Sequence, residues 1–277
     1  MMGADSSKAD GATATKPTLI GVPYGNNPSR ARMLIYHKGI EAEFDLKTPA
    51  DYGGLAADAY RALNPQGKMP VLLLGSGEAL YEARVITGYI LDAYAGTGPS
   101  MIPTSAKLRA RAQQIIAVHD LYIASPNSLH PSVTSNQGCA YKSVEQVDAP
   151  NRSRKLSEVA TQLEVLEGLI IGPYAVGDEP TEADMTLYPT LGVLLPYLVD
   201  RVFGWPCLLS SADHPKLSAW LATVEQLPAA LRIKQEMLPG LHEWESSGRF
   251  DPIRAQIKAA PELPWSRDQL VSKARGA

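Results

Sequence analysis

The first residues that could take part in a reaction are the polar side chains of YGNNPSRAR, residues 24–32. Asn26 and Asn27 carry amides that can donate a hydrogen bond, and the hydroxyls of Tyr24 and Ser29 can do the same. An asparagine amide can therefore stabilise a negative charge, but it cannot act as a base. Such residues before a proline are also typical of turns and helix N-caps. The segment offers a set of donors ahead of a helix, with no cysteine among them.

A second group lies in the stretch NPQGKMPVLLLGSGEALYEARVITGYILDAY, residues 64–94. Lys68, Met69 and Pro70 immediately precede an apolar run, and Glu82 and Ala83 stand at the head of a helical pattern. Taken alone, Pro70 has the position of an ordinary trans proline that starts an edge strand. Motifs elsewhere in the sequence decide whether Pro70 also has a role in binding.

Composition excludes several classes of function. The chain has 277 residues with 26 basic and 29 acidic side chains, which gives no electrostatic footprint for nucleic acid or an anionic membrane. No window approaches 18 consecutive apolar residues, so no membrane span is expected. Cys139 and Cys207 lie outside C-x-x-C or His/Cys spacings, so neither a metal site nor a disulfide framework is predicted. Small molecules and proteins are the expected partners.

Hydrophobic periodicity predicts the elements of an N-terminal α/β region. Apolar runs and alternation indicate strands, and apolar positions three and four residues apart indicate helices. Residues 18–94 are therefore predicted to follow the order β-α-β-α-β-β-α. The first predicted strand opens the run 18–25, which ends in turn residues, and the other strands are 42–46, 71–74 and 79–81. The predicted helices start after Pro28, at Leu55 and at Glu82.

The remaining chain is helical in period. The segment 96–105 is rich in Gly and Pro and is predicted to link two domains. The segment between the first two long helices, residues 125–151, is predicted to be a kinked helix or a binding loop. The opening residues are small and polar, which predicts a flexible tail. This tail lacks the apolar core of a signal peptide, so a cytoplasmic location is expected, although a plastid address rich in Ser, Thr and Ala also fits. The predicted division is a tail at 1–17, an α/β domain at 18–95, a linker at 96–105, an all-α domain at 106–240 and an extension at 241–277.

Three motifs make residues 18–237 resemble the cytosolic glutathione transferase superfamily. NPQGKMP is similar to the family's N-P-x-G-x-(V/I/M)-P signature, and YEARVITGYILDAY is similar to its E-S-x-A-I-x-x-Y-L segment. VGDEPTEADMTLYP is similar to its G-D-x-x-(S/T)-x-A-D segment, in which Thr181 and Asp184 have the spacing of a capping box. The resemblance implies a thioredoxin-like domain followed by an all-helical domain.

The resemblance also implies a glutathione site. Pro70 is then a cis proline that lets the backbone of Met69 pair with the cysteinyl part of glutathione. Glu82 would hold the amino group of the γ-glutamyl arm, and Lys68 the glycyl carboxylate, unless that lysine is simply solvated. Ala83 stands where the family commonly has Ser, so only its backbone N–H would remain for the γ-glutamyl carboxylate.

The family lowers the pKa of the glutathione thiol with a hydroxyl donor at the start of the first helix. In this chain that position aligns with Asn26 or Asn27, and Ser29 or Tyr24 could supply a hydroxyl instead. Because the loop has no cysteine, thiol transfer and dehydroascorbate reduction are disfavoured.

The second substrate would lie between this loop and the first long helix of the helical domain. Arg111, His119 and Tyr122 are candidates to line its hydrophobic pocket, with Tyr141 beside them, although a histidine on an apolar helix face is more often a core residue. The expected function is conjugation of glutathione to a small hydrophobic electrophile by a homodimer. The alternative is a non-catalytic glutathione- or ligand-binding member of the same fold.

Overall fold

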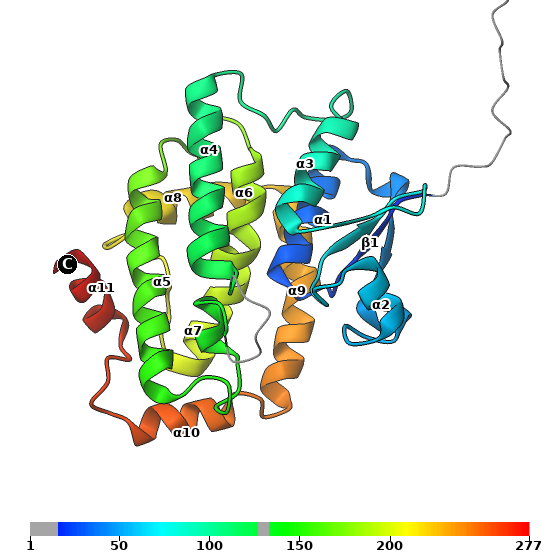
Figure 1. The fold of residues 1–277 in the computed structure, drawn as a ribbon. Helices are drawn as coiled ribbons and strands as arrows, with labels where there is room; N and C mark the ends of the chain where they lie inside the picture. Colours follow the sequence, from blue (N-terminus) through cyan, green and yellow to red (C-terminus); the bar gives the residue numbers. More distant parts are fainter. Residues whose placement is uncertain (1–15, 127–132, 277) are drawn as a thin grey trace, which may run out of the picture.

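The computed structural model of the chain describes residues 16–126 and 133–276. These residues form an N-terminal α/β unit and a helical unit (Figure 1). The α/β unit has the predicted order β-α-β-α-β-β-α. Its elements are β1 (Thr18–Ile20), α1 (Asn26–Lys38), β2 (Asp45–Lys47), α2 (Asp58–Leu63), β3 (Val71–Leu73), β4 (Ala79–Tyr81) and α3 (Ala83–Ala93).

The four strands form one mixed sheet in the order β2-β1-β3-β4. β1 pairs in parallel with β2 and antiparallel with β3, while β4 pairs antiparallel with β3. The second strand and the second helix each start three residues later than predicted. Residues Glu41–Glu43 form a 3₁₀ turn, so the second strand starts at Asp45. Ala57 has an extended backbone (ψ 145°) and caps α2, so that helix cannot start at Leu55.

Helix α1 lies between the sheet and the helical unit (Figure 1). Gly25 precedes it in an extended conformation, and Pro28 is tolerated in its first turn because the early N–H groups have no partner within the helix. Gly39 ends the helix with φ 67°, and its N–H donates to the carbonyls of Ile35 and Tyr36. The helix contacts α3 on one side and the helical unit on the other, so its start faces both domains.

The helical unit begins after the predicted linker. In η3 the helix α4 continues as a π-helical turn, and α6 likewise continues into η5. None of the helices formed by the described residues is both long and apolar enough to span a bilayer. The elements are α4 (Ala106–Val118), η3 (His119–Ala124), η4 (Gln137–Ala140), α5 (Ala149–Leu169), α6 (Glu182–Leu187), η5 (Tyr188–Leu194), α7 (Leu195–Phe203), α8 (Pro215–Val224), α9 (Pro228–Ser246), α10 (Asp251–Ala259) and α11 (Arg267–Gly276).

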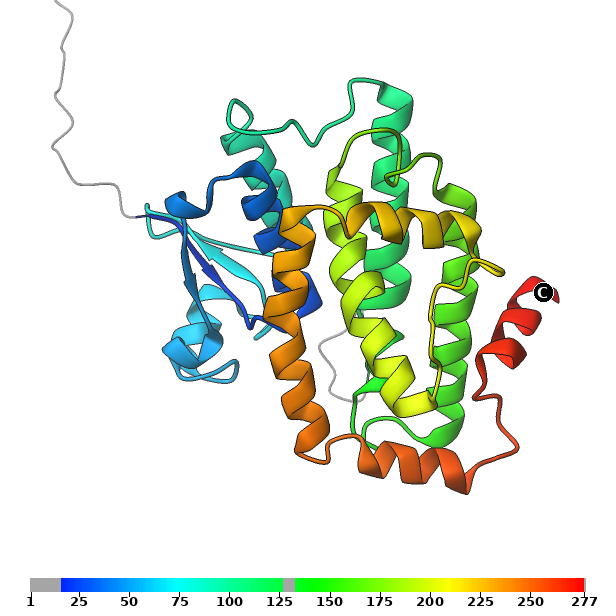
Figure 2. The ribbon, with the colours of Figure 1, turned by 180° about the vertical axis from the view of Figure 1, so that it is seen from behind.

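The expected domain boundary between residues 240 and 241 falls inside α9. This helix runs beside α1 (Figure 2) and contains both Pro239 and Gly240. The Tyr24 ring packs so closely here that a Cβ at position 240 would lie 2.1 Å from its Cδ1 atom. Glycine at 240 therefore serves close packing and does not end the helix. The following helices also belong to the helical unit, because α10 contacts α7 and α11 contacts α5.

A buried arginine organises part of the segment between α4 and α5. Arg152 is fully buried and donates hydrogen bonds to the carbonyls of Cys139, Lys142 and Val147 and to the side chain of Gln256. It thereby fixes a loop and α10 to the start of α5. Residues 127–132 of the predicted loop lie outside the described part of the chain.

Candidate active site

A cleft of about 510 Å³ opens where the α/β unit meets the helical unit. Four segments line it: the start of α1, the loop before β3, the head of α3, and η3 with the two residues that follow it. Its walls mix charged, amide and apolar side chains. The lining residues are Asn27, Arg30, Asn64, Gln66, Lys68, Met69, Pro70, Glu82, Ala83, Arg84, Asp120, Leu121, Ala124, Ser125 and Pro126.

The loop before β3 contributes all three residues predicted from the NPQGKMP motif. The peptide bond between Met69 and Pro70 is cis, as the motif predicts. The carbonyl of Lys68 accepts hydrogen bonds of 2.8 Å from the Tyr60 hydroxyl and from the Asn64 amide. Internal hydrogen bonds therefore fix this wall of the cleft.

The head of α3 contributes Glu82 and Ala83. Glu82 is the N-cap of the helix and has φ 71° and ψ 118°, the only positive φ of a non-glycine residue in the described chain. Its side chain is exposed and lines the cleft. Left-handed backbone in a non-glycine residue costs free energy and tends to be retained at functional positions. The conformation places a carboxylate beside the backbone start of α3.

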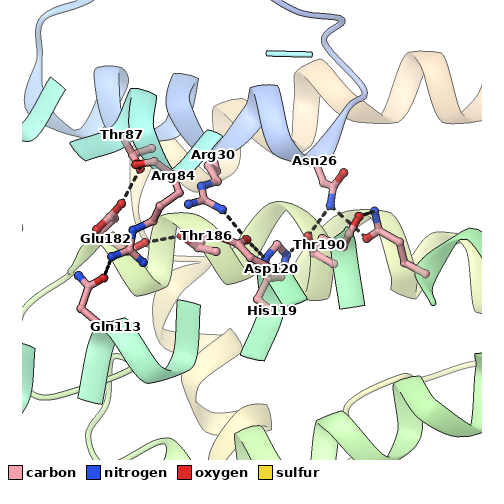
Figure 3. Close-up of polar contacts among 12 residues, drawn as sticks. Asn26, Arg30, Arg84, Thr87, Gln113, His119, Asp120, Glu182, Thr186 and Thr190 are labelled. Carbon is pink, nitrogen blue, oxygen red and sulfur yellow. Dashed lines mark hydrogen bonds and ion pairs between the residues drawn. The ribbon is translucent and has the colours of Figure 1, made fainter. Parts of the chain in front are cut away.

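The two asparagines of α1 face different surroundings. Asn27 lines the cleft, whereas Asn26 is buried and its Nδ2 donates to Thr190 Oγ1 at 2.8 Å and to Gln137 Oε1 at 3.1 Å (Figure 3). Both belong to the helix itself, and Gly25 occupies the N-cap position. The amide of Asn26 is therefore committed to the helical unit, and Asn27 is the asparagine that faces the cleft.

Neither hydroxyl candidate lines the cleft. The buried Ser29 donates to the carbonyl of Pro23 at 3.0 Å and accepts from Arg32 at 2.8 Å. The Tyr24 ring packs edge-on against Trp244, with centroids 5.4 Å apart. Both side chains are therefore engaged in structural contacts with other protein groups.

The structure does not bring the three predicted acceptor-pocket residues to the cleft. His119 is buried, Tyr122 is 50% exposed, and Arg111 is a half-buried residue of α4, yet none of them lines the cavity. The π-helical turn of η3 changes the helical register where α4 ends. As a result, Asp120 and Leu121 line the cleft in their place. Tyr141 packs against Trp244, with ring centroids 5.6 Å apart.

Sequence reasoning missed an ion pair in the cleft wall. Arg30 Nη1 lies 2.7 Å from Asp120 Oδ1, which also lies 2.8 Å from His119 Nδ1 (Figure 3). Burial raises the pKa of Asp120, but the hydrogen bond from His119 and the charge of Arg30 outweigh it and lower this pKa to about 2. Asp120 is therefore ionised at neutral pH. Arg30 follows Asn27 by three residues on a helix, and this spacing is the one signal that could have placed both on one face.

A chain of hydrogen bonds connects this ion pair to Asn26. His119 Nδ1 donates to the Asp120 carboxylate, which can only accept, and His119 Nε2 lies 2.7 Å from Thr190 Oγ1. Thr190 in turn accepts from Asn26 (Figure 3). These hydrogen bonds thus connect the start of α1 to η3 and η5. In the part of the chain that the structure describes, no group of three or more His, Cys, Asp or Glu side chains could hold a metal ion.

Comparisons with known proteins agree with this architecture. The family model "Glutathione S-transferase, N-terminal domain" matches residues 19–98, and "Glutathione S-transferase, C-terminal domain" matches residues 149–223. Glutathione S-transferase 3 of Zea mays is 30% identical over 218 residues, which cover 76% of this chain and 90% of the relative. The chain belongs to the cytosolic glutathione transferase superfamily.

Other members of the superfamily carry different names. A maleylacetoacetate isomerase of Pseudomonas aeruginosa is 29% identical over 218 residues, which cover 73% of this chain and 94% of the relative. The crystal structure of a maleylacetoacetate isomerase from Methylobacterium extorquens with bound malonate and GSH has a TM-score of 0.62. The two chains are 23% identical, and the match covers 80% of this chain and 98% of the isomerase chain, which shows that they share a fold. The helices α10 and α11 lie beyond the matched C-terminal domain.

Proposed function

We propose that the cleft binds glutathione and activates its thiol for attack on a small electrophile. The observation that carries this proposal is the convergence of the cis Met69–Pro70 loop, Glu82 and Asn27 on one cavity. The maleylacetoacetate isomerase from Methylobacterium extorquens, which shares this fold, was solved with bound GSH. The cavity has a cation at Lys68 and a carboxylate at Glu82, which match the glycyl carboxylate and the γ-glutamyl amino group of the tripeptide.

The proposed chemistry starts with loss of the thiol proton to solvent. With the cysteinyl part at the backbone of Met69, the sulfur faces the first turn of α1, where the free N–H groups and the helix dipole favour a negative charge. A thiol pKa near 8.5 falls at such sites. The thiolate then forms a carbon–sulfur bond to the electrophile, and a leaving group departs or the product takes up a proton. Small electrophiles would enter along the wall formed by Leu121 and Ala124.

Calorimetry with glutathione, followed by turnover on a substrate panel, tests this function. The panel contains chloro-nitroaromatic, epoxide, isothiocyanate and peroxide substrates, together with maleylacetoacetate because the Pseudomonas relative is named for its isomerisation. We expect micromolar to millimolar binding and turnover on at least one compound. Binding without turnover would instead favour the non-catalytic alternative, which the missing hydroxyl at Asn27 also suits. Absence of binding would contradict both functions.

Replacing Asn27 with alanine is expected to slow turnover at neutral pH by about 5- to 150-fold, because one donor to the thiolate is lost. Glutathione affinity should change little, since Glu82 and the Met69 backbone remain. Asn27→Ser should restore the rate, and thiolate absorbance across pH gives the thiol pKa directly. Asn26→Ala is the matched control. It breaks buried bonds to Thr190 and Gln137, so it should lower stability while leaving the thiol pKa unchanged. Equal thiol pKa values in Asn27→Ala and the parent would contradict this role.

The two cysteines are predicted to take no part in turnover. Burial raises the pKa of the Cys139 thiol to about 12, so it stays protonated and unreactive at neutral pH, while Cys207 is exposed and does not line the cleft. Cys207→Ser and Cys139→Ala should therefore retain activity. Cys139→Ser should retain activity as well but lose about 1–3 kcal/mol of stability if its buried hydroxyl finds no partner. Loss of activity in a folded Cys139→Ala variant would revive a thiol-transfer mechanism.

Homodimerisation through α3 and α4 is a further part of the proposal. Val85 and Tyr89 lie four residues apart on α3 and are 50% and 37% exposed, so they form an apolar stripe on one helix face. Light scattering at micromolar concentration should give twice the monomer mass, and Val85→Glu should shift the protein towards monomer. A monomer in the parent protein would contradict the prediction.

A further inference from the structure

Arg30 is a buried cation with unused hydrogen-bond donors. Its side chain is 1% exposed, and Nη1 binds Asp120, but Nε and Nη2 have no hydrogen-bond partner among the described residues. Arg152, which is also fully buried, donates its hydrogen bonds to backbone carbonyls and to Gln256. A buried donor without an acceptor costs free energy and calls for an explanation such as a bound water, ion or ligand. The unpartnered nitrogens of Arg30 therefore point to an acceptor that arrives with the ligand.

The position of Arg30 limits what this acceptor can be. Arg30 and Asn27 lie three residues apart on α1 and line the same cleft. Side chains on a helix lean towards its N-terminus, so the Arg30 side chain covers the turn that contains Asn27. Under the proposed function, the glutathione sulfur faces this turn. Among the residues that the structure describes, no other arginine is both buried and part of this cleft, since Arg84 is exposed.

We infer that Arg30 is the cation that stabilises the thiolate of bound glutathione and takes over the role of the missing hydroxyl. This inference rests on the proposed function. The thiol proton leaves to solvent, the guanidinium keeps all its protons, and its unpartnered N–H groups donate to the sulfur. No other bond forms or breaks in this step.

Asp120 then sets how much of the Arg30 charge reaches the sulfur. The titratable groups facing Arg30 are Asp120 and, behind it, His119, both from the helical unit. Lys68, Glu82 and Arg84 line the cleft from other segments, the loop before β3 and the head of α3. Because the Asp120 carboxylate partly neutralises the guanidinium, its removal should favour the thiolate, whereas removal of Arg30 should disfavour it. A pair that only holds the fold together would not give these opposite signs.

The test measures the pKa of glutathione bound to Arg30→Met, Asp120→Asn and the double variant by the ultraviolet absorbance of the thiolate. Arg30→Met should raise this pKa by about 1–3 pH units, and Asp120→Asn should lower it by up to about one unit. The double variant should resemble Arg30→Met. Arg32→Met is the control, because Arg32 is also buried on α1 but faces Ser29 and Glu236 and does not line the cleft. Glutathione bound to Arg32→Met should have the same thiol pKa as glutathione bound to the parent protein.

Each result decides the inference. An unchanged thiol pKa in folded Arg30→Met, or a raised one in Asp120→Asn, overturns it and leaves the pair a structural contact with water on the unused nitrogens. If Arg30→Met does not fold, Asp120→Asn decides alone: a lowered thiol pKa supports the inference, and an unchanged or raised one overturns it. Calorimetry on the parent protein separates this outcome from the proposed function, because a parent that binds no glutathione contradicts the function itself.

Discussion

Asp184→Ala is expected to lower the free energy of unfolding by about 3–5 kcal/mol, because it strands several buried donors at once. Asp184 is fully buried and completes a capping box with Thr181, whose backbone N–H and hydroxyl donate to Oδ2 at 2.7 and 2.9 Å. Its other oxygen accepts from the Ala175 N–H and from Trp220 Nε1, each at 2.8 Å. One carboxylate therefore joins α6, the turn before it and α8. Denaturant unfolding of the purified variant measures the loss.

The chain offers a matched control for this capping box. Thr48 and Asp51 form a second box with the same two distances, 2.7 and 2.9 Å, but in an exposed turn and without further donors. Asp51→Ala removes the same local motif in water, so its effect should be far smaller. A similar loss in the two variants would show that the buried donors at Asp184 contribute little, against the expectation.

The sequence predicted those parts of the site that depend on local motifs. The cis peptide before Pro70, the position of Glu82 at the head of α3 and the Thr181 capping box all follow from short patterns with fixed backbone roles. The order of strands and helices in the α/β unit follows from apolar periodicity in the same way. Such features depend on neighbours within a few residues, which a sequence displays directly.

Features that depend on which face of a helix meets the cleft were not predictable. Neighbouring helical residues point about 100° apart, so an ambiguity of one residue between Asn26 and Asn27 decides whether the amide meets the cleft or Thr190. The helix after Val118 is π-helical, so α-helical spacing does not predict its faces, and Asp120 and Leu121 line the cavity where His119 and Tyr122 were expected. Packing between distant segments sets both outcomes.

Buried charge and close packing were hidden for a related reason. Arg30 resembles any helical arginine until η3 supplies Asp120, which lies 90 residues away in the chain. Pro239 and Gly240 resemble a helix break until the Tyr24 ring occupies the space where a side chain would stand. In both cases the role of the residue depends on a contact with a residue of the other domain.

Replacing Glu82 should separate stability from ligand binding. The residue has φ 71°, a conformation that costs a non-glycine residue about 1–3 kcal/mol and that glycine adopts readily. Glu82→Gly therefore relieves strain, and Glu82→Ala keeps it. Although glycine usually lowers stability relative to alanine by up to about 1 kcal/mol, we expect the glycine variant to be the more stable of the two. Denaturant unfolding of both variants measures the difference.

Glutathione affinity should fall in both variants by about 10- to 150-fold, because each loses a charge-assisted hydrogen bond to the γ-glutamyl amino group. Glu78→Ala serves as the control, since Glu78 is an exposed carboxylate of the neighbouring hairpin outside the cleft. A stabilised Glu82→Gly protein that no longer holds glutathione would mean that the positive φ persists because the carboxylate is needed in the cleft. If instead both variants bind as tightly as the parent, Glu82 does not contact the ligand, and the strain at the head of α3 requires a different cause.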